Sequence, residues 1–127
     1  MILTELERWN RRQAAGFLKD GADHCRETGL HVGAYWPGAS NDCAVVTHPY
    51  VDGEPCCAVG HVYVGAGMTT PGGNNVVDLA VQALADVVGA KHVSYVADWS
   101  DKHGRTAVEV EAALRQAAEN LELEAAA

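Results

Sequence analysis

The stretch NNVVDLAVQALADVVG, residues 74–89, is apolar on almost every face of the helix that its spacing predicts. A helix of this kind is stable in water only when neighbouring elements cover most of its surface. Gly89 marks its C-terminal end, because glycine readily adopts the left-handed conformation that closes a helix. We therefore expect a helix over residues 75–88 at the centre of a domain built mainly from other helices.

Two further helices are predicted from matching start signals. Thr4 and Glu7, and again Thr106 and Glu109, have the T-x-x-E spacing of a capping box. In that motif the Thr hydroxyl and the Glu carboxylate accept hydrogen bonds from backbone N–H groups that the helix leaves unpaired. Helices are therefore expected to begin near residues 4 and 106.

The first of these helices is expected to end at Gly29, and Gly16 and Gly21 predict a kink or break inside it. The last helix has an apolar stripe that we expect to be buried. The stripe follows three-to-four spacing through Ala107, Val110, Leu114, Ala117 and Leu121. Residues 122–127 are expected to form a frayed tail.

The segment from residue 30 to residue 52 has a pattern typical of strands. LHVGAYW (30–36) and CAVVTHPYV (43–51) are rich in valine and aromatic residues, and the turn-forming PGASND separates them. This pattern predicts a two-stranded β-hairpin. A short helix is expected over about residues 55–65, because Pro55 suits the first turn of a helix. Residues 91–100 fit a strand and a helical turn equally well.

Length and composition predict a mainly α, single-domain helical bundle over residues 1–127. The chain has about four expected helices, with the short β-hairpin as an insertion. No apolar run approaches membrane-spanning length, so a membrane partner is not expected. The charged N-terminus lacks the order of a secretory signal, which predicts a cytoplasmic protein with reduced thiols at Cys25, Cys43, Cys56 and Cys57.

The formal net charge of −8 argues against direct nucleic-acid binding. Phosphate recognition needs clustered basic residues, and only Arg8, Arg11 and Arg12 gather here. An acidic protein can also imitate nucleic acid, but the carboxylates are mostly dispersed along the chain. A charged helix face that simply contacts solvent explains them better.

The run GEPCCAVGH, residues 53–61, raises the question of a metal site. Cys43 and His48, followed by Cys57 and His61, supply thiolate and imidazole groups that zinc prefers. Neither pair has the short C-x-x-C spacing of a structural zinc site, and His24, Cys25 and His31 satisfy the same requirement on paper. The leading expectation is therefore packing, with no metal or cofactor, and zinc is the alternative.

A thiol-based site is the other chemical reading of this run. Cys56 or Cys57 could act as a nucleophile with His61 as its base and Asp98 or Asp101 orienting that histidine, because a helix N-terminus lowers a thiol pKa. Side chains that face a core leave little room for a substrate, however, and no glycine-rich oxyanion loop is evident beside them. A close-packed helix start with small residues accounts for the same run.

Two short motifs stand out: the helix start CAVG at residues 57–60, and DWSD at 98–101 followed by Arg105 and Thr106. Together they resemble a family of small proteins of unknown function from actinobacteria and their phages. This chain departs from the family pattern at His61, where the family tends to have alanine, and at Ser100, where it tends to have asparagine. The resemblance implies a compact, mainly helical domain of actinobacterial or phage origin, and it carries no activity.

The leading functional expectation is a non-enzymatic cytoplasmic protein that acts through contact with another protein. The resemblance suggests a phage accessory protein that binds a host component. Aromatic residues outside the expected helices, Tyr35, Trp36 and Tyr50, are the candidate contact residues. The alternative function is a zinc-binding or thiol-based small-molecule site around Cys57 and His61.

Overall fold

The computed structural model describes residues 2–39 and 48–127. The long helices are α1 (Glu5–Thr28), α3 (Asn75–Val88) and α5 (Ala107–Ala126). The short elements are α2 (Ala58–Gly65), the 3-10 helix η1 (Val93–Tyr95) and α4 (Val96–Asp101). The predicted mainly helical fold is confirmed, and within residues 91–100, which the sequence left open, residues 93–100 are helical.

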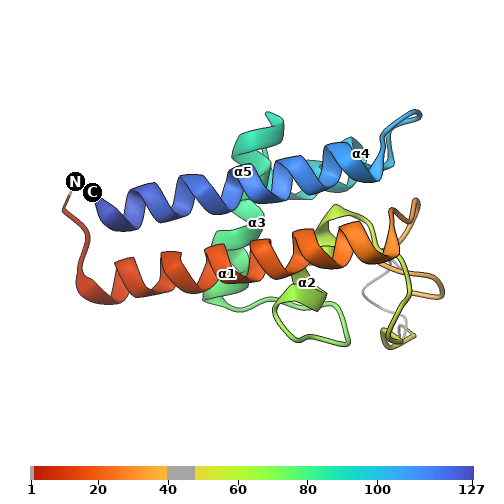
Figure 1. The fold of residues 1–127 in the computed structure, drawn as a ribbon, viewed down its shortest axis with the longest axis horizontal. Helices are drawn as coiled ribbons and strands as arrows, with labels where there is room; N and C mark the ends of the chain where they lie inside the picture. The colour runs from red at the N-terminus through yellow and green to blue at the C-terminus, as the bar shows by residue number, and fades with distance from the viewer. Residues whose placement is uncertain (1, 40–47) are drawn as a thin grey trace.

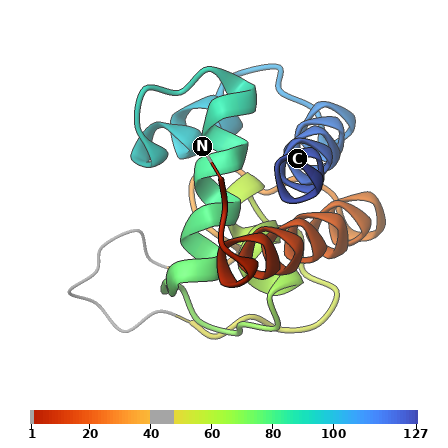
Figure 2. The same ribbon diagram turned by 90° about the vertical axis from the view of Figure 1, so that its left-hand side faces the viewer.

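Helices α1 and α5 lie side by side and run in opposite directions, so that both chain ends are at one end of the molecule (Figure 1). Helix α3 runs across this pair, and the second view shows the same crossing (Figure 2). Its Val77, Ala80 and Leu84 are fully buried. The apolar surface of α3 is thus covered by neighbours, as its sequence predicts.

The three long helices start where the sequence predicts. The Thr4 hydroxyl accepts from the Glu7 N–H at 3.1 Å, and the Glu7 carboxylate accepts from the Thr4 N–H at 3.3 Å. Thr106 caps α5 by accepting from the Glu109 N–H at 3.2 Å. Asn74 caps α3 in the same way. These bonds satisfy donors that each helix leaves unpaired in its first turn.

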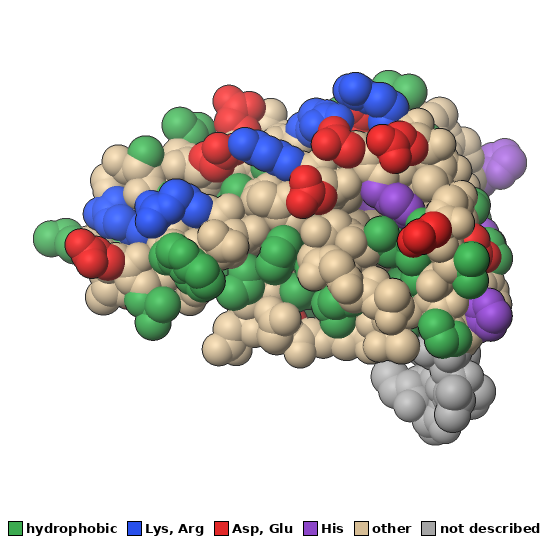
Figure 3. Space-filling model, turned by 60° about the horizontal axis from the view of Figure 1, so that its bottom comes forward, with side chains coloured by type: hydrophobic (Ala, Val, Ile, Leu, Met, Phe, Trp, Pro, Cys, Tyr) green, Lys and Arg blue, Asp and Glu red, His purple; other side chains and the backbone are tan. Residues whose placement is uncertain are grey.

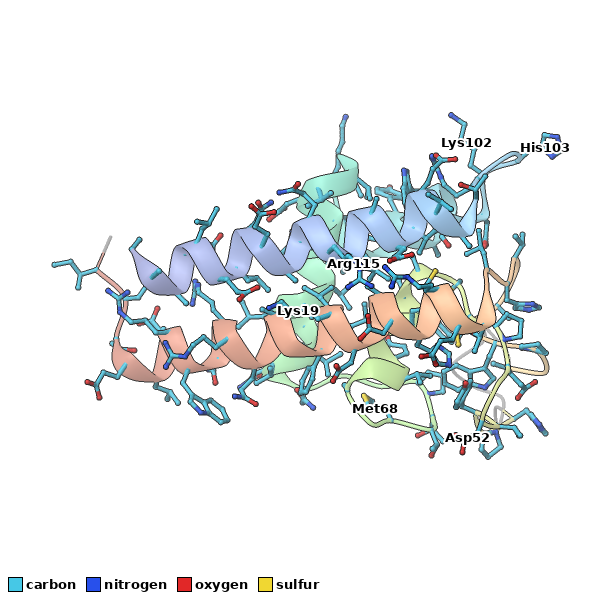
Figure 4. All side chains as sticks on the ribbon, viewed as in Figure 1. Lys19, Asp52, Met68, Lys102, His103 and Arg115 are labelled. Atoms are coloured by element: carbon cyan, nitrogen blue, oxygen red, sulfur yellow. The ribbon has the colours of Figure 1, made fainter. Side chains whose placement is uncertain are left out.

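Ion pairs join the exposed edges of α1 and α5. Arg115 contacts Asp23 and Glu111, at 2.8 and 2.9 Å, and it lies between the two helices in Figure 4. Arg26 contacts the same Glu111 at 2.7 Å. The hydrogen bonds that Glu111 accepts, first from Arg26 and then from Arg115, hold the pKa of its carboxyl below the usual value. Such exposed ion pairs stabilise a fold only weakly, so their role is to align α1 with α5.

The kink or break predicted in α1 is not seen, because one helix runs from Glu5 to Thr28 through both glycines and Figure 1 shows no sharp bend in it. At Gly21 the absent side chain admits the backbone of α2, since an added Cβ would lie 2.6 Å from the His61 carbonyl oxygen. Gly21 is therefore a contact point rather than a break. The tail expected to fray is helical to Ala126, with Ala125 buried.

The predicted β-hairpin is not seen in the described residues. Residues 30–39 and 48–57 form an irregular loop with one isolated bridge, Leu30 to Cys56, while residues 40–47 lie outside the described part. Gly33 and Gly38 have φ values of 95° and 82°, which bend the chain away from strand geometry. A small second core, made of Trp36, Ala39, Tyr50 and Cys56, orders the loop instead.

The predicted helix over 55–65 starts later, at Ala58, with Cys57 as its N-cap. Pro55 belongs to the preceding loop, and the chain turns into the helix only after both cysteines. In the described part of the chain, no helix combines the length and the apolar character that crossing a membrane requires.

Candidate metal centre

Three side chains with metal-binding atoms converge where α2 crosses the C-terminal half of α1. His24 comes from α1, His61 from α2, and Cys56 from the loop that enters α2. One ligand atom of each lies within 4.8 Å of the others. His61 and Cys56 have no exposed surface, and His24 is partly buried.

Close backbone contacts of α2, and of the loop before it, determine the positions of these three side chains. The close approach of Gly21 to the His61 carbonyl brings α2 against α1, and Gly65 repeats it one turn later, where an added Cβ would lie 2.3 Å from the Phe17 oxygen. The Cys56 carbonyl accepts from the His31 N–H at 2.9 Å. The two histidines, 37 residues apart in the sequence, are thereby held on facing surfaces.

A chain of hydrogen bonds runs through the two imidazoles. His61 Nε2 lies 2.9 Å from the Gly29 carbonyl, which can only accept, so His61 donates there. His61 Nδ1 is then an acceptor in the neutral ring, and His24 Nδ1 donates to it across 2.7 Å. The Tyr50 hydroxyl donates to His24 Nε2, and the Gly53 N–H in turn donates to that hydroxyl at 3.2 Å.

Burial keeps both imidazoles neutral. Desolvation, followed by the nearby His24, lowers the pKa of His61 to about 4. Desolvation also lowers the pKa of His24, against the opposing effect of Glu27 and Asp52. A neutral imidazole is the form that binds metal ions, so these rings need not lose a proton at neutral pH before they can act as ligands.

The thiol of Cys56 is protonated in this environment. Burial, and then the neighbouring Cys57 and Glu54, raise its pKa far above the ordinary value for cysteine. A bound cation reverses that preference, because a coordinating thiol is deprotonated outright. The metal-free thiol is thus inert as a nucleophile, and it becomes a strong ligand only when a metal ion arrives.

The donor set, two imidazoles and one thiol, is suited to zinc. Zinc–nitrogen bonds of about 2.0–2.1 Å in a tetrahedral site place two nitrogens roughly 3.3 Å apart. The Nδ1 atoms of His24 and His61 are 2.7 Å apart, with the proton of one hydrogen bond between them. Small rotations of the rings would therefore let an ion take the place of that proton.

The groups around the imidazoles can accommodate that exchange. With an ion on both Nδ1 atoms, His24 would carry its proton on Nε2 and donate it to the Tyr50 oxygen. The Tyr50 hydroxyl has a second acceptor, the Glu54 carbonyl at 3.3 Å. The Gly29 carbonyl already orients His61 in the way that outer partners orient metal-binding histidines. A water molecule could complete the coordination.

The ligand set considered from the sequence is only partly brought together. His61 lies in the cluster, whereas Cys43 lies outside the described residues and His48 is exposed. The Cys57 sulfur accepts from the Gly60 N–H at 3.4 Å as the N-cap of α2, and burial raises its pKa to about 11. The structure selects His24 from the further ligands that the sequence allowed, and it places Cys56 rather than Cys57 beside the histidines.

The thiol-based alternative gains no support from the surroundings of these residues. Neither carboxylate considered as an orienting group contacts His61: Asp98 is exposed, and Asp101 accepts from the Gly33 N–H at 3.1 Å. The pKa of each nearby thiol is raised rather than lowered, with burial as the main cause. The arrangement favours metal coordination over nucleophilic attack by sulfur.

The aromatic residues expected to contact a partner are mostly internal. Trp36 is fully buried and donates its indole N–H to the His48 carbonyl at 2.7 Å. Tyr50 is 9% exposed and packs edge-on against both Trp36 and His24. Tyr35 is partly buried beside Tyr63. Their role in contact with a partner stays a prediction.

Comparisons with curated proteins and with solved structures gave no match. A family model, described as a family of unknown function, DUF6197, matches residues 9–120. That range contains all of the candidate metal centre and nearly all of the helical core. It confirms the predicted membership of a family without an assigned activity. The chain belongs to the family of unknown function DUF6197.

Proposed function

We propose that this protein binds a zinc ion through His24, Cys56 and His61. The observation that carries the proposal is the convergence of three ligand atoms, from three separate segments, within 4.8 Å. Zinc is the preferred ion because it accepts imidazole and thiolate together in tetrahedral geometry. The ion would tie the loop before α2 and α2 itself to α1.

Three features of the surroundings support a metal ion at this point. Both imidazoles are neutral, and the Nε2 atom of each contacts a protein oxygen. That oxygen is the Gly29 carbonyl for His61 and the Tyr50 hydroxyl for His24. The third group is a thiol in a dry setting, where coordination by a cation offsets the cost of deprotonation. A buried pair of histidines that only stabilises the fold needs no more than a hydrogen bond between the rings. The cysteine beside this pair is a third metal ligand, which such a structural role does not require.

The test is metal titration of the purified, chelator-treated protein. We expect equimolar zinc binding, and cobalt(II) binding with a thiolate-to-metal charge-transfer band. Cys56→Ser should weaken cobalt binding by about 100-fold or more and remove the thiolate band, because a neutral hydroxyl is a poor ligand. His61→Gln provides a second test that leaves every thiol in place.

Cys57→Ser is the matched control, because it removes the adjacent sulfur and supplies serine, a good N-cap, in its place. It should bind cobalt with the wild-type affinity and spectrum. The proposal fails if the wild-type protein binds neither ion. It also fails if Cys57→Ser loses the band as completely as Cys56→Ser does.

Contact with another protein is a second candidate, favoured by one exposed group of side chains. Ile2, Leu6 and Trp9 are 91%, 67% and 49% exposed at the start of α1. A shallow depression there is also lined by Arg8 and Arg12. Figure 3 shows hydrophobic and basic side chains next to each other at the end that carries both termini. Tryptophan and arginine are enriched among residues that dominate binding energy.

The expected result is a protein partner whose capture depends on Trp9. Affinity capture from the cells that express the chain should recover that partner with the wild type, and recovery should fall with Trp9→Ser. Tyr95→Ser is the control, because Tyr95 is 54% exposed at a site remote from this end. Equal recovery with all three proteins would contradict this candidate.

A further inference from the structure

A pocket of about 430 Å³ lies on the other side of α2 from the metal centre. Val59 and Tyr63 line it from α2, two positions before and after His61 and therefore on the opposite helix face. Asp78 and Val81 line it from α3, and Val93 and Ala97 from the segment around α4. Its volume falls within the range of small-molecule sites, about 300–1,000 Å³.

The pocket has one formally charged side chain, the carboxylate of Asp78. Its other lining residues are Tyr35, Val59, Tyr63, Val81, Gln82, Val93, Ser94 and Ala97, none of them basic. Across residues 2–39 and 48–127, no lysine, arginine or histidine forms an ion pair with Asp78. Gly73 leaves room for the carboxylate, since an added Cβ there would lie 2.7 Å from Asp78 Oδ1.

The aromatic part of the wall is built by two tyrosines. The rings of Tyr35 and Tyr63 pack edge to face, with centroids 5.3 Å apart. Burial, and then the neighbouring Tyr35, raise the pKa of the Tyr63 hydroxyl, so it stays neutral and adds no second negative charge. Aromatic faces attract cations, most strongly where water is partly excluded.

We propose that this pocket binds a small organic cation, an amine with an apolar body. Asp78 is exposed at the rim and would pair with the ammonium group, while Val59 and Val81 would contact the apolar part. The rings of Tyr35 and Tyr63 supply a neutral, electron-rich part of the lining. An anionic ligand has no basic partner in this lining, and a neutral one leaves the carboxylate unused. The site is independent of the metal centre, so either can exist without the other.

The test compares ligands of one shape and different charge. Phenethylammonium is the cation, 2-phenylethanol the neutral probe, and 3-phenylpropionate the anion. Each is titrated into ¹⁵N-labelled protein, with amide shifts of α2, α3 and α4 as the readout. We expect the cation to bind with a Kd of about 1 mM or tighter, the neutral probe several-fold more weakly, and the anion not measurably.

Two variants locate the effect. Asp78→Asn should weaken phenethylammonium by about threefold to tenfold and leave 2-phenylethanol unchanged, because only the charged pairing is lost. Asp86→Asn is the matched control, since it removes the same charge from the same helix outside this pocket. Ala97→Leu should fill the pocket and abolish binding of both probes, with its unchanged far-UV circular dichroism as the check on folding.

The proposal is overturned if the cation produces no localised amide shifts up to about tenfold the expected Kd. It is also overturned if Asp86→Asn weakens the cation as much as Asp78→Asn does. That result would mean that the cation responds to the net charge of −8 rather than to this site.

Discussion

Replacing Gly21 with alanine is expected to lower the free energy of unfolding by about 1–3 kcal/mol or more. The added Cβ would lie 2.6 Å from the His61 carbonyl oxygen and 3.0 Å from its carbonyl carbon. Both are backbone atoms of α2, so the clash cannot be relieved by a side-chain rotation. The helices must separate, and that movement displaces His61 from His24.

Gly16→Ala on the same helix is the control, and the opposite sign is expected. No atom lies within 4 Å of a Cβ added at Gly16, and alanine restricts the unfolded chain more than glycine does. We expect a gain of about 0.5–1 kcal/mol, measured for both variants by urea unfolding monitored at 222 nm. A stabilising Gly21→Ala would show that α1 and α2 do not approach as closely as the structure places them.

These two glycines show what the sequence can and cannot determine about the fold. Both weaken helix propensity, so local reasoning treats them alike and predicts a kink. Whether a glycine faces open space or another backbone depends on a helix that lies far along the chain. The capping signals at Thr4 and Thr106 were predictable because their hydrogen bonds lie within one helical turn.

The candidate metal centre was only partly predictable for a similar reason. His61 stands out in the sequence beside two cysteines, but the choice of Cys56 over Cys57 depends on where α2 begins. Cys57 became the N-cap, which left Cys56 in the loop facing the histidines. His24 joins them through the crossing of α1 and α2, and no spacing rule reaches across 37 residues.

The predicted hairpin is not seen in residues 30–39 and 48–52, because strand propensity is decided by pairing and burial rather than by residue type alone. In the loop around Trp36, side-chain packing supplies the order that a β ladder would have supplied. The indole N–H of Trp36 contacts the His48 carbonyl, and its ring packs against Tyr50. The loop is therefore arranged around one aromatic side chain.

Replacing Trp36 with alanine is accordingly expected to lower the free energy of unfolding by about 3–5 kcal/mol. Trp36 is fully buried in the second core with Tyr50 and Cys56, so its removal leaves a cavity and an unpaired His48 carbonyl. Trp9→Ala is the control of equal size, because Trp9 is 49% exposed, and we expect a loss of less than about 1 kcal/mol.

Trp36→Ala should also expose the thiol of Cys56 in the candidate metal centre. Cys56 packs in the cluster with Trp36, and opening that cluster should speed its reaction with a disulfide reagent in native buffer by about tenfold or more. For this measurement all proteins, including the wild type, carry Cys43→Ser, which removes the cysteine that lies outside the described residues. If Trp36→Ala unfolds like Trp9→Ala and its thiols react no faster, the second core does not hold the loop. The position of Cys56 beside the histidines would then need another cause.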